Sequence, residues 1–311
     1  MKKLIYILAP TLLFAACTKD ISRFNEETKK PANVPAATLF SNGVRNLSDA
    51  LASGSVNTNV FRFTVKHWAM AVYQDEAQFD FSTRNIPQAW WTTMYRDVLA
   101  DLNESAKVVN ADGQLEAGEK ANKLAIIDLM EVYTYNILVN TFGDVPYTEA
   151  LNPNILFPKY DDAKTIYADL LKRLDADIAN LNPSKAGFAA SEDLIYGKFI
   201  IAGNGNLTLT IPKWIKFANS LKMKMGMIIA DVDAATAKTT VEAADAGAMS
   251  SSADDAKVTY LGATPNTNPL YADIVLGGRG DYVAAEDLMN VLDALNDPRK
   301  DNFFGTNNAG E

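Results

Sequence analysis

The sequence predicts a mainly α-helical fold, built from paired amphipathic helices with a small β-hairpin and long binding loops. Apolar residues recur at helical spacing in four segments, and turn-forming residues stand between these segments. Only one stretch shows the alternation expected of strands, and one long loop carries proline and glycine without any apolar period. These observations favour a mainly helical protein whose long loops form the binding surface.

Each of the four periodic segments predicts one helix with a single apolar stripe. In the first two, the apolar residues lie at offsets of 0, 4, 7 and 11 residues. The third follows Asp161 and Asp162, either of which can cap its first turn, and the fourth has Pro212 near its first turn. The stripes run from Trp91 to Leu102, from Ile126 to Ile137, from Ile166 to Ile178 and from Trp214 to Ile229.

The connections between these helices predict antiparallel pairs. Ala-Asp-Gly113 follows the first helix, and Gly143 stands at the C-terminal end of the second. Amphipathic pairs of this kind resemble tetratricopeptide-type stacking, although the sequence shows no clean repeat of the roughly 34 residues typical of it. The resemblance is therefore one of architecture only.

The segment from Phe199 to Ile211 predicts the β-hairpin. Asn204-Gly205 is a typical two-residue hairpin turn, and alternating apolar residues follow it.

The N-terminal residues predict export and lipid attachment. Two lysines precede an apolar stretch from Leu4 to Phe14 that is too short to span a bilayer, and two alanines lead into Cys17. We therefore expect residues 1–16 to be a lipoprotein signal peptide and Cys17 to be the lipidation site. Residues 17–35 are polar with two prolines and read as a lipidated spacer. In the alternative, the signal is an ordinary secretory one and Cys17 is incidental.

The composition argues against several classes of partner and site. The formal net charge is −9, from 29 basic and 38 acidic residues, whereas nucleic-acid-binding proteins cluster Lys and Arg. Cys17 is the only cysteine, which excludes an intramolecular disulfide and a cysteine-based metal site. No second apolar stretch is long enough to span a bilayer, so lipid is the only membrane attachment that we expect.

Two segments outside the apolar stripes carry the side chains expected of a sugar-binding surface. One runs from Gln78 to Pro87, just before Trp90, and the other from Thr264 to Tyr282. Aromatic rings pack against the apolar CH faces of sugars, while planar polar side chains bond their hydroxyl groups. We therefore predict one concave ligand-binding region that contains Trp90, Phe81, Arg84, Asn85 and Tyr271.

The two adjacent tryptophans receive different roles. Neighbouring residues on a helix point about 100° apart, so Trp90 and Trp91 cannot both face the same core. Trp91 belongs to the periodic stripe and is assigned to the core, which leaves Trp90 for the ligand. In the alternative, Trp90 packs against a neighbouring helix, because large aromatic side chains are mostly buried.

The sequence predicts no catalytic residue and no cofactor. His67, the only histidine, lies in an expected helical stretch without a partner motif, which excludes a histidine-based triad or a two-histidine zinc site. Asp75-Glu76 is expected to be a solvated helix end, although a carboxylate pair of a glycosidase could include it. Asp231 and Asp233 do not fit the spacing of a calcium loop, so a metal remains unassigned.

Five short motifs follow one another along the chain: Trp91 with Tyr95, Asn140–Ala150, Tyr160–Tyr167, Trp214–Lys222 and Leu295–Arg299. They resemble the motifs of SusD/RagB-type outer-membrane lipoproteins of Bacteroidota, and they stand in the order of that family. The resemblance implies a SusD-like helical domain on the outer face of the outer membrane, where it binds substrate over a SusC-like TonB-dependent transporter. Lys19-Asp20 is similar to the short acidic signals that send such lipoproteins to the surface.

The resemblance implies that residues 36–311 form this domain and that it is truncated, since family members continue beyond a turn like Leu295–Arg299. Our leading hypothesis is a non-enzymatic, lipid-anchored binding protein that captures an oligosaccharide and delivers it to the transporter. Three alternatives remain: the same role with a peptide ligand, a surface glycoside hydrolase, and a helical-repeat adaptor that binds only protein.

Overall fold

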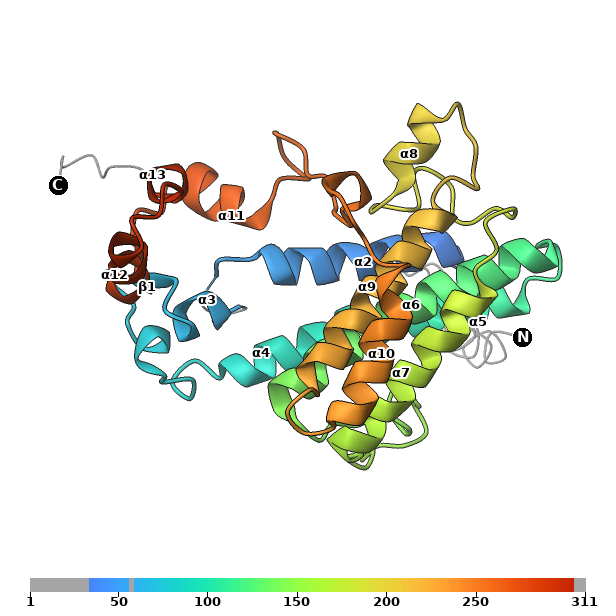
Figure 1. Ribbon diagram of the computed structural model, residues 1–311, viewed down its shortest axis with the longest axis horizontal. Helices are drawn as coiled ribbons and strands as arrows, with labels where there is room; N and C mark the ends of the chain where they lie inside the picture. The colour runs from blue at the N-terminus through green and yellow to red at the C-terminus, as the bar shows by residue number, and fades with distance from the viewer. Residues whose placement is uncertain (1–33, 56–58, 305–311) are drawn as a thin grey trace, which may run out of the picture. The chain divides into compact units, whose positions relative to one another are not determined.

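Helices make up most of the structure, a computed structural model that describes residues 34–55 and 59–304 (Figure 1). The predicted fold class is confirmed: the described chain is mainly helical and contains one small antiparallel sheet. The longer helices are α2 (Ala36–Ala52), α5 (Ala100–Ala111), α6 (Ala117–Phe142), α7 (Ala163–Asn180), α9 (Ile211–Ile228) and α10 (Ala234–Asp245). The shorter elements are α3 (Phe61–Thr64), β1 (Trp68–Met70), η3 (Glu76–Gln78), α4 (Ile86–Thr92), η4 (Thr93–Leu99), α8 (Gly197–Ala202), η5 (Ser252–Asp254), α11 (Pro269–Tyr271), η6 (Ala272–Leu276), β2 (Tyr282–Ala284), α12 (Glu286–Ala294) and α13 (Lys300–Phe303).

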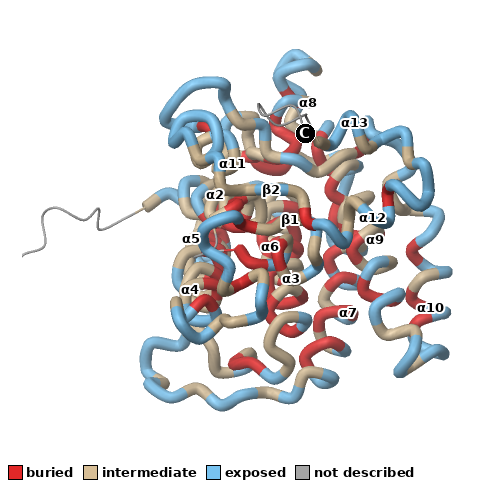
Figure 2. Tube along the Cα trace, turned by 90° about the vertical axis from the view of Figure 1, so that its left-hand side faces the viewer, coloured by how far each residue is buried: buried red, intermediate tan, exposed pale blue. Residues whose placement is uncertain are grey.

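The central helix is α6, which packs against α5, α7 and α9. Twelve of its 26 residues are buried, and they face more than one side of the helix. Figure 2 shows buried residues gathered along α6 and on the inner sides of α7 and α9. No helix within the described residues combines the length and the apolar character that crossing a membrane requires.

The predicted helix pairs form around this centre. The pair α5 and α6 is joined by residues 112–116, and α9 and α10 are joined by residues 229–233. Asp162 caps α7 as predicted, because its Oδ1 accepts a hydrogen bond from the Thr165 amide at 2.8 Å. Asp161 has a different role: its Oδ2 accepts from the amides of Tyr147 and Thr148 and closes the long loop between α6 and α7.

A π-helical segment shifts the stripe of the first predicted helix. The helix runs without a break from α4 through η4 to α5, and η4 is a π-helix, in which one extra residue per turn rotates the following side chains. The buried face that includes Val98 and Leu102 therefore continues back to Met94 and Trp90. Trp91 and Tyr95 pack at the edge of this face. The assignment of Trp91 rather than Trp90 to the core is thus wrong.

The prediction of a β-hairpin at 199–211 is also wrong, because this segment contains no strand. Phe199 and Ile200 lie in α8, and the Gly205 amide donates to the Ile200 carbonyl at 2.9 Å, a bond typical of a helix end. Asn204 and Gly205 do have positive φ, 54° and 85°, but they end a helix instead of joining two strands. A turn thus forms at Asn204-Gly205, but the two strands that the sequence predicts on either side of it do not.

The sheet joins two segments far apart in the sequence. β1 pairs antiparallel with β2, with Trp68 opposite Ala284 and Met70 opposite Tyr282. The segment from Thr264 to Tyr282, which the sequence predicts to be a loop, contains α11, η6 and the first residue of β2. His67 lies in the turn before β1 rather than in a helix, and its carbonyl accepts from the Ala285 amide at 3.2 Å.

A buried carboxylate fixes the start of α9 against the segment that precedes α8. Asp193 is 2% exposed, and its side chain accepts hydrogen bonds from the amides of Ile195 and Tyr196 and from Trp214 Nε1. Burial raises the pKa of Asp193, while these three donors oppose that rise. Trp214 itself is fully buried and packs edge to face against Tyr196.

The interface of α6 with α7 holds three acidic side chains and one arginine. Arg173 Nε donates to Asp128 Oδ2 at 3.1 Å, and its Nη2 donates to Glu131 Oε2 at 2.8 Å. Asp177, one turn further along α7, is 4% exposed, and its Oδ2 has no hydrogen-bond partner. Burial, together with the neighbouring charge of Asp128, raises the pKa of Asp177 to about 9, and burial raises that of Glu131 to about 7.

We predict that Trp214→Phe lowers the free energy of unfolding by about 1–3 kcal/mol, because it leaves the buried Asp193 carboxylate without one donor. Denaturant unfolding of the purified variant measures this change. The matched control is Trp91→Phe, the same change at a half-buried tryptophan that packs at the edge of the core. Equal losses for the two variants would contradict a special role for the Asp193 bond.

We also predict a pH dependence of stability that originates at Asp177. The folded carboxyl keeps its proton up to a pH of about 9, while an unfolded aspartate loses it near pH 3.9. The stabilisation from this proton is complete below pH 4 and is lost as the pH rises toward 9, by at most about 1.4 kcal/mol per unit.

Unfolding free energies measured from pH 5 to 9 should therefore fall less steeply for Asp177→Asn than for the unchanged protein. Asp175→Asn is the control, because Asp175 lies on the same helix but is exposed and pairs with Lys222. Parallel slopes for all three proteins would contradict the assignment.

Candidate functional site

A cavity of about 350 Å³ lies beside α4 and carries four aromatic rings on its wall. The rings come from separate elements: Phe61 from α3, Phe81 from the loop before α4, Trp90 from α4 and Phe142 from the end of α6. The remaining lining residues are Val60, Thr64, Ile86, Pro87 and Thr141. The wall is therefore mostly apolar and aromatic.

Trp90 forms the inner wall of this aromatic cavity. Its side chain is 3% exposed and packs edge to face against Phe61, with ring centroids 5.2 Å apart. Its indole Nε1 is buried and has no hydrogen-bond partner. Phe61, in contrast, is 40% exposed, and Phe81 is half-buried, so these two rings form the accessible part of the wall.

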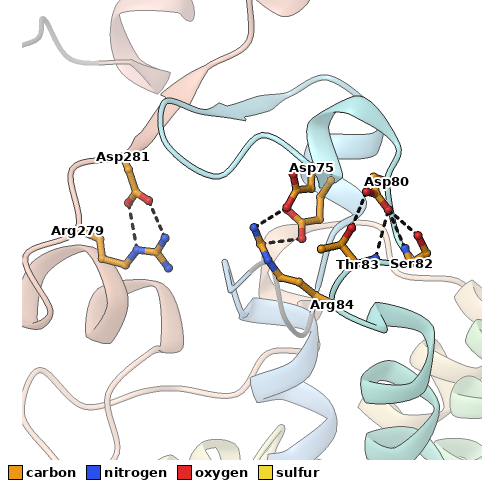
Figure 3. A network of polar contacts seen from close by, with 8 residues as sticks. Asp75, Asp80, Ser82, Thr83, Arg84, Arg279 and Asp281 are labelled. Atoms are coloured by element: carbon orange, nitrogen blue, oxygen red, sulfur yellow. Dashed lines mark hydrogen bonds and ion pairs between the residues drawn. The ribbon is translucent and has the colours of Figure 1, made fainter.

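The loop that supplies Phe81 is held in place by its own polar side chains (Figure 3). Asp80 accepts from the hydroxyl groups and amides of both Ser82 and Thr83, and these bonds hold the pKa of Asp80 at about 2. Its carboxylate therefore stays ionised over the whole physiological range. The consequence is a tight turn that fixes the position of the neighbouring Phe81.

Arg84 ties the same loop to the turn of η3. Its Nη1 donates to Glu76 Oε1 at 2.7 Å and its Nη2 donates to Asp75 Oδ2 at 2.9 Å. The guanidinium also lies over the Tyr73 ring, 5.1 Å from its centroid. Asp75 and Glu76 are therefore partners of an arginine, and the expected solvated helix end is wrong for Glu76, which is fully buried.

The five predicted ligand-binding residues are only partly brought together. Trp90 and Phe81 line the aromatic cavity, whereas Arg84 points to the η3 turn. Asn85 is exposed, has a left-handed backbone (φ 49°) and directly precedes α4. Tyr271 lies in α11, a segment that contacts η6 and α2 and does not line this cavity.

Sequence reasoning missed the rings of Phe61 and Phe142. Both belong to helices, whereas the residues predicted to bind the ligand lie in predicted loops or just after one. Phe142 lies within the Asn140–Ala150 motif, which the structure explains mainly by packing: Gly143 ends α6 with φ 78°, and Tyr95 Oη donates to the Pro146 carbonyl at 2.6 Å. That motif was the one signal that could have pointed to Phe142.

The second predicted loop is stabilised in a similar way, and none of its residues lines the aromatic cavity. Arg279 pairs with Asp281 through two bonds, 3.0 Å and 2.7 Å long, and its guanidinium lies over the Tyr282 ring (Figure 3). These contacts stabilise the turn before β2. Arg279-Gly-Asp281 is thus accounted for by the local structure.

The side chains of the cavity wall are aliphatic, aromatic or hydroxyl-bearing. Within the described residues, no three side chains of His, Cys, Asp or Glu come together as a metal-binding group. The aromatic cavity is lined by no carboxylate and no histidine. Its arrangement therefore suits the binding of a ligand with an apolar face.

Comparison with known proteins identifies the family. The sequence model of the SusD-like family described as "Starch-binding associating with outer membrane" matches residues 28–311. No curated protein gives a significant match.

Solved structures share the fold. A structure named as a chitin-binding protein is 25% identical in sequence to this chain, with a TM-score of 0.68. The match covers 85% of this chain and 53% of the chain in that structure. A SusD/RagB family protein from Bacteroides thetaiotaomicron is 22% identical, with a TM-score of 0.66 over 86% of this chain and 53% of its own. A chitin-binding SusD homologue from Flavobacterium johnsoniae is 20% identical, with a TM-score of 0.65 over 85% and 53%. The chain thus spans about half the length of these structures. Because the family model matches residues 28–311, which are most of the chain, the protein belongs to the SusD-like family.

Proposed function

We propose that this protein is a surface-exposed, lipid-anchored binding protein that captures an oligosaccharide and delivers it to a SusC-like TonB-dependent transporter. Membership of the SusD-like family, whose description names starch binding and the outer membrane, supports this proposal. The single observation that carries the binding part is the aromatic cavity beside α4.

The cavity fits the apolar face of a sugar ring. Phe61 and Phe81 are accessible from outside, and ring CH groups of a sugar pack well against such rings. Thr64 and Thr141 are the polar side chains of the wall, but their hydroxyl hydrogens go to the carbonyls of Val60 and Ile137. Specific hydrogen bonds to the sugar hydroxyls would therefore come from side chains outside the wall, such as that of Asn85, which is exposed and directly precedes Ile86 of the wall.

We predict that Phe81→Ala weakens oligosaccharide binding about tenfold, because one stacked ring contributes on the order of 1 kcal/mol or more. Calorimetric titration with maltohexaose and chitohexaose measures the change. The matched control is Phe79→Ala, since Phe79 is an exposed ring in contact with Phe81 that does not line the cavity. Truncation of Trp90 is less informative, because losing a buried tryptophan costs about 3–5 kcal/mol of stability.

Two outcomes would contradict the proposed site. If Phe79→Ala and Phe81→Ala weaken binding equally, the effect belongs to the loop as a whole. If neither sugar binds the unchanged protein, the ligand is not a glycan of these two classes. New reducing ends released during the same titration would instead support the glycosidase alternative.

The anchor has a separate test. Cys17 lies outside the described residues, so its lipidation stays a prediction. We expect Cys17→Ser to move the full-length protein from the membrane fraction to the soluble fraction, because lipid is the only attachment that the sequence predicts. Variant protein that still sediments with outer membranes after high-salt and carbonate washes would contradict it.

A further inference from the structure

A second cavity, of about 340 Å³, lies between α2, α6 and α9, and residues 256–258 form one side of it. Its volume falls within the range of small-molecule pockets, about 300–1,000 Å³. Most of the lining side chains are apolar, and only Ser48, Tyr133 and Lys257 bring polar side-chain atoms to it. This α2 cavity shares no lining residue with the aromatic cavity and has no role in the function proposed above.

The hydroxyl groups of the α2 cavity differ in what they can offer a ligand. Tyr260 Oη donates to Asp49 Oδ1 at 2.7 Å, so the 2.9 Å contact between Ser48 and Tyr260 uses the hydrogen of Ser48. The Tyr133 hydroxyl, in contrast, makes no hydrogen bond to any described residue and is not buried away from solvent. Burial of the side chain raises the pKa of Tyr133, so this hydroxyl keeps its hydrogen and is a free donor.

The charged groups next to the α2 cavity are mainly cations. Lys257 lines the cavity and pairs with Asp255 at 3.4 Å, but both side chains are exposed, so this ion pair is weak. Lys224 Nζ lies 5.8 Å from the centre of the Tyr133 ring and forms no ion pair with a described residue. No carboxylate lines the cavity. Its surroundings are therefore locally positive on a protein whose net charge is −9.

The side of the α2 cavity formed by residues 256–258 is held only at its ends. Asp254 pairs with Lys213 and Lys216, each at 2.8 Å, and Tyr260 is bonded to Asp49. Within the described residues, no hydrogen bond reaches the backbone of residues 256–258 themselves. This side can therefore shift to admit a ligand without breaking a backbone hydrogen bond.

We propose that the α2 cavity binds an organic carboxylate with an apolar chain, such as a medium-chain fatty acid. The chain would lie against the apolar wall, and the carboxylate would accept a hydrogen bond from Tyr133, with Lys257 and Lys224 balancing its charge. A carboxylate only accepts hydrogen bonds, which suits a cavity whose free polar hydrogens belong to a phenol and an ammonium group. A sugar fits less well, because most of its hydroxyls would face apolar side chains without a partner.

Calorimetric titration of the full chain with sodium octanoate tests this inference. We expect binding at least about tenfold weaker in Tyr133→Phe, which removes only the hydroxyl that bonds the charged carboxylate. The matched control is Tyr160→Phe, the same change at an exposed ring outside the cavity, and it should leave the affinity unchanged. Lys257→Gln alters an exposed side chain and should weaken binding about two- to fivefold.

Four results would overturn the proposal. Equal affinity for octanoate in Tyr133→Phe and the unchanged protein would remove this hydroxyl from the site. Equal binding of 1-octanol, the uncharged counterpart, would show that the cavity selects apolar shape and not charge. A loss of octanoate binding in Phe81→Ala but not in Tyr133→Phe would place the acid in the aromatic cavity. No binding of octanoate or of the longer dodecanoate would exclude this class of ligand.

Discussion

The burial of α6 on several sides is the constraint on which the rest of the structure depends. Because so much of this helix is surrounded by protein, each of its buried polar side chains needs a hydrogen-bond partner within the protein. Asn122, fully buried, donates to the carbonyls of Asn182, Lys185 and Ala186 and accepts from the Asn182 amide. Asp128 and Glu131 find Arg173 on α7. These bonds determine how neighbouring segments meet α6, and the end of the helix then delivers Phe142 to the aromatic cavity.

The helical part of the fold could be predicted because it depends on local patterns. The stripes at 126–137 and 166–178 are reproduced in α6 and α7, and Asp162 acts as the expected cap. The sheet could not be predicted, since each strand has only three residues and the partners are separated by most of the chain. Asn204-Gly205 shows a related difficulty: a residue pair with positive φ serves a hairpin and a helix end equally well.

The candidate site was predicted only in part, for two physical reasons. A π-helical segment cannot be read from a period of 3.6 residues, and it offsets the side chains before Thr93 from those after Leu99, so that Trp90 rather than Trp91 is in line with the most buried face. Trp90 is nevertheless part of the cavity wall, so burial and ligand contact are compatible at this position. In addition, the wall joins α3, a loop, α4 and α6, and no local pattern indicates that Phe61 and Phe142 meet there.

The most direct test of the central claim is the position of a bound sugar. A crystal structure of the protein with chitohexaose or maltohexaose, whichever binds more tightly, would locate it. Our account predicts a sugar ring stacked on Phe81, with its apolar face toward the cavity formed with Phe61 and Trp90. A sugar bound at a different surface, with the aromatic cavity empty, would contradict it.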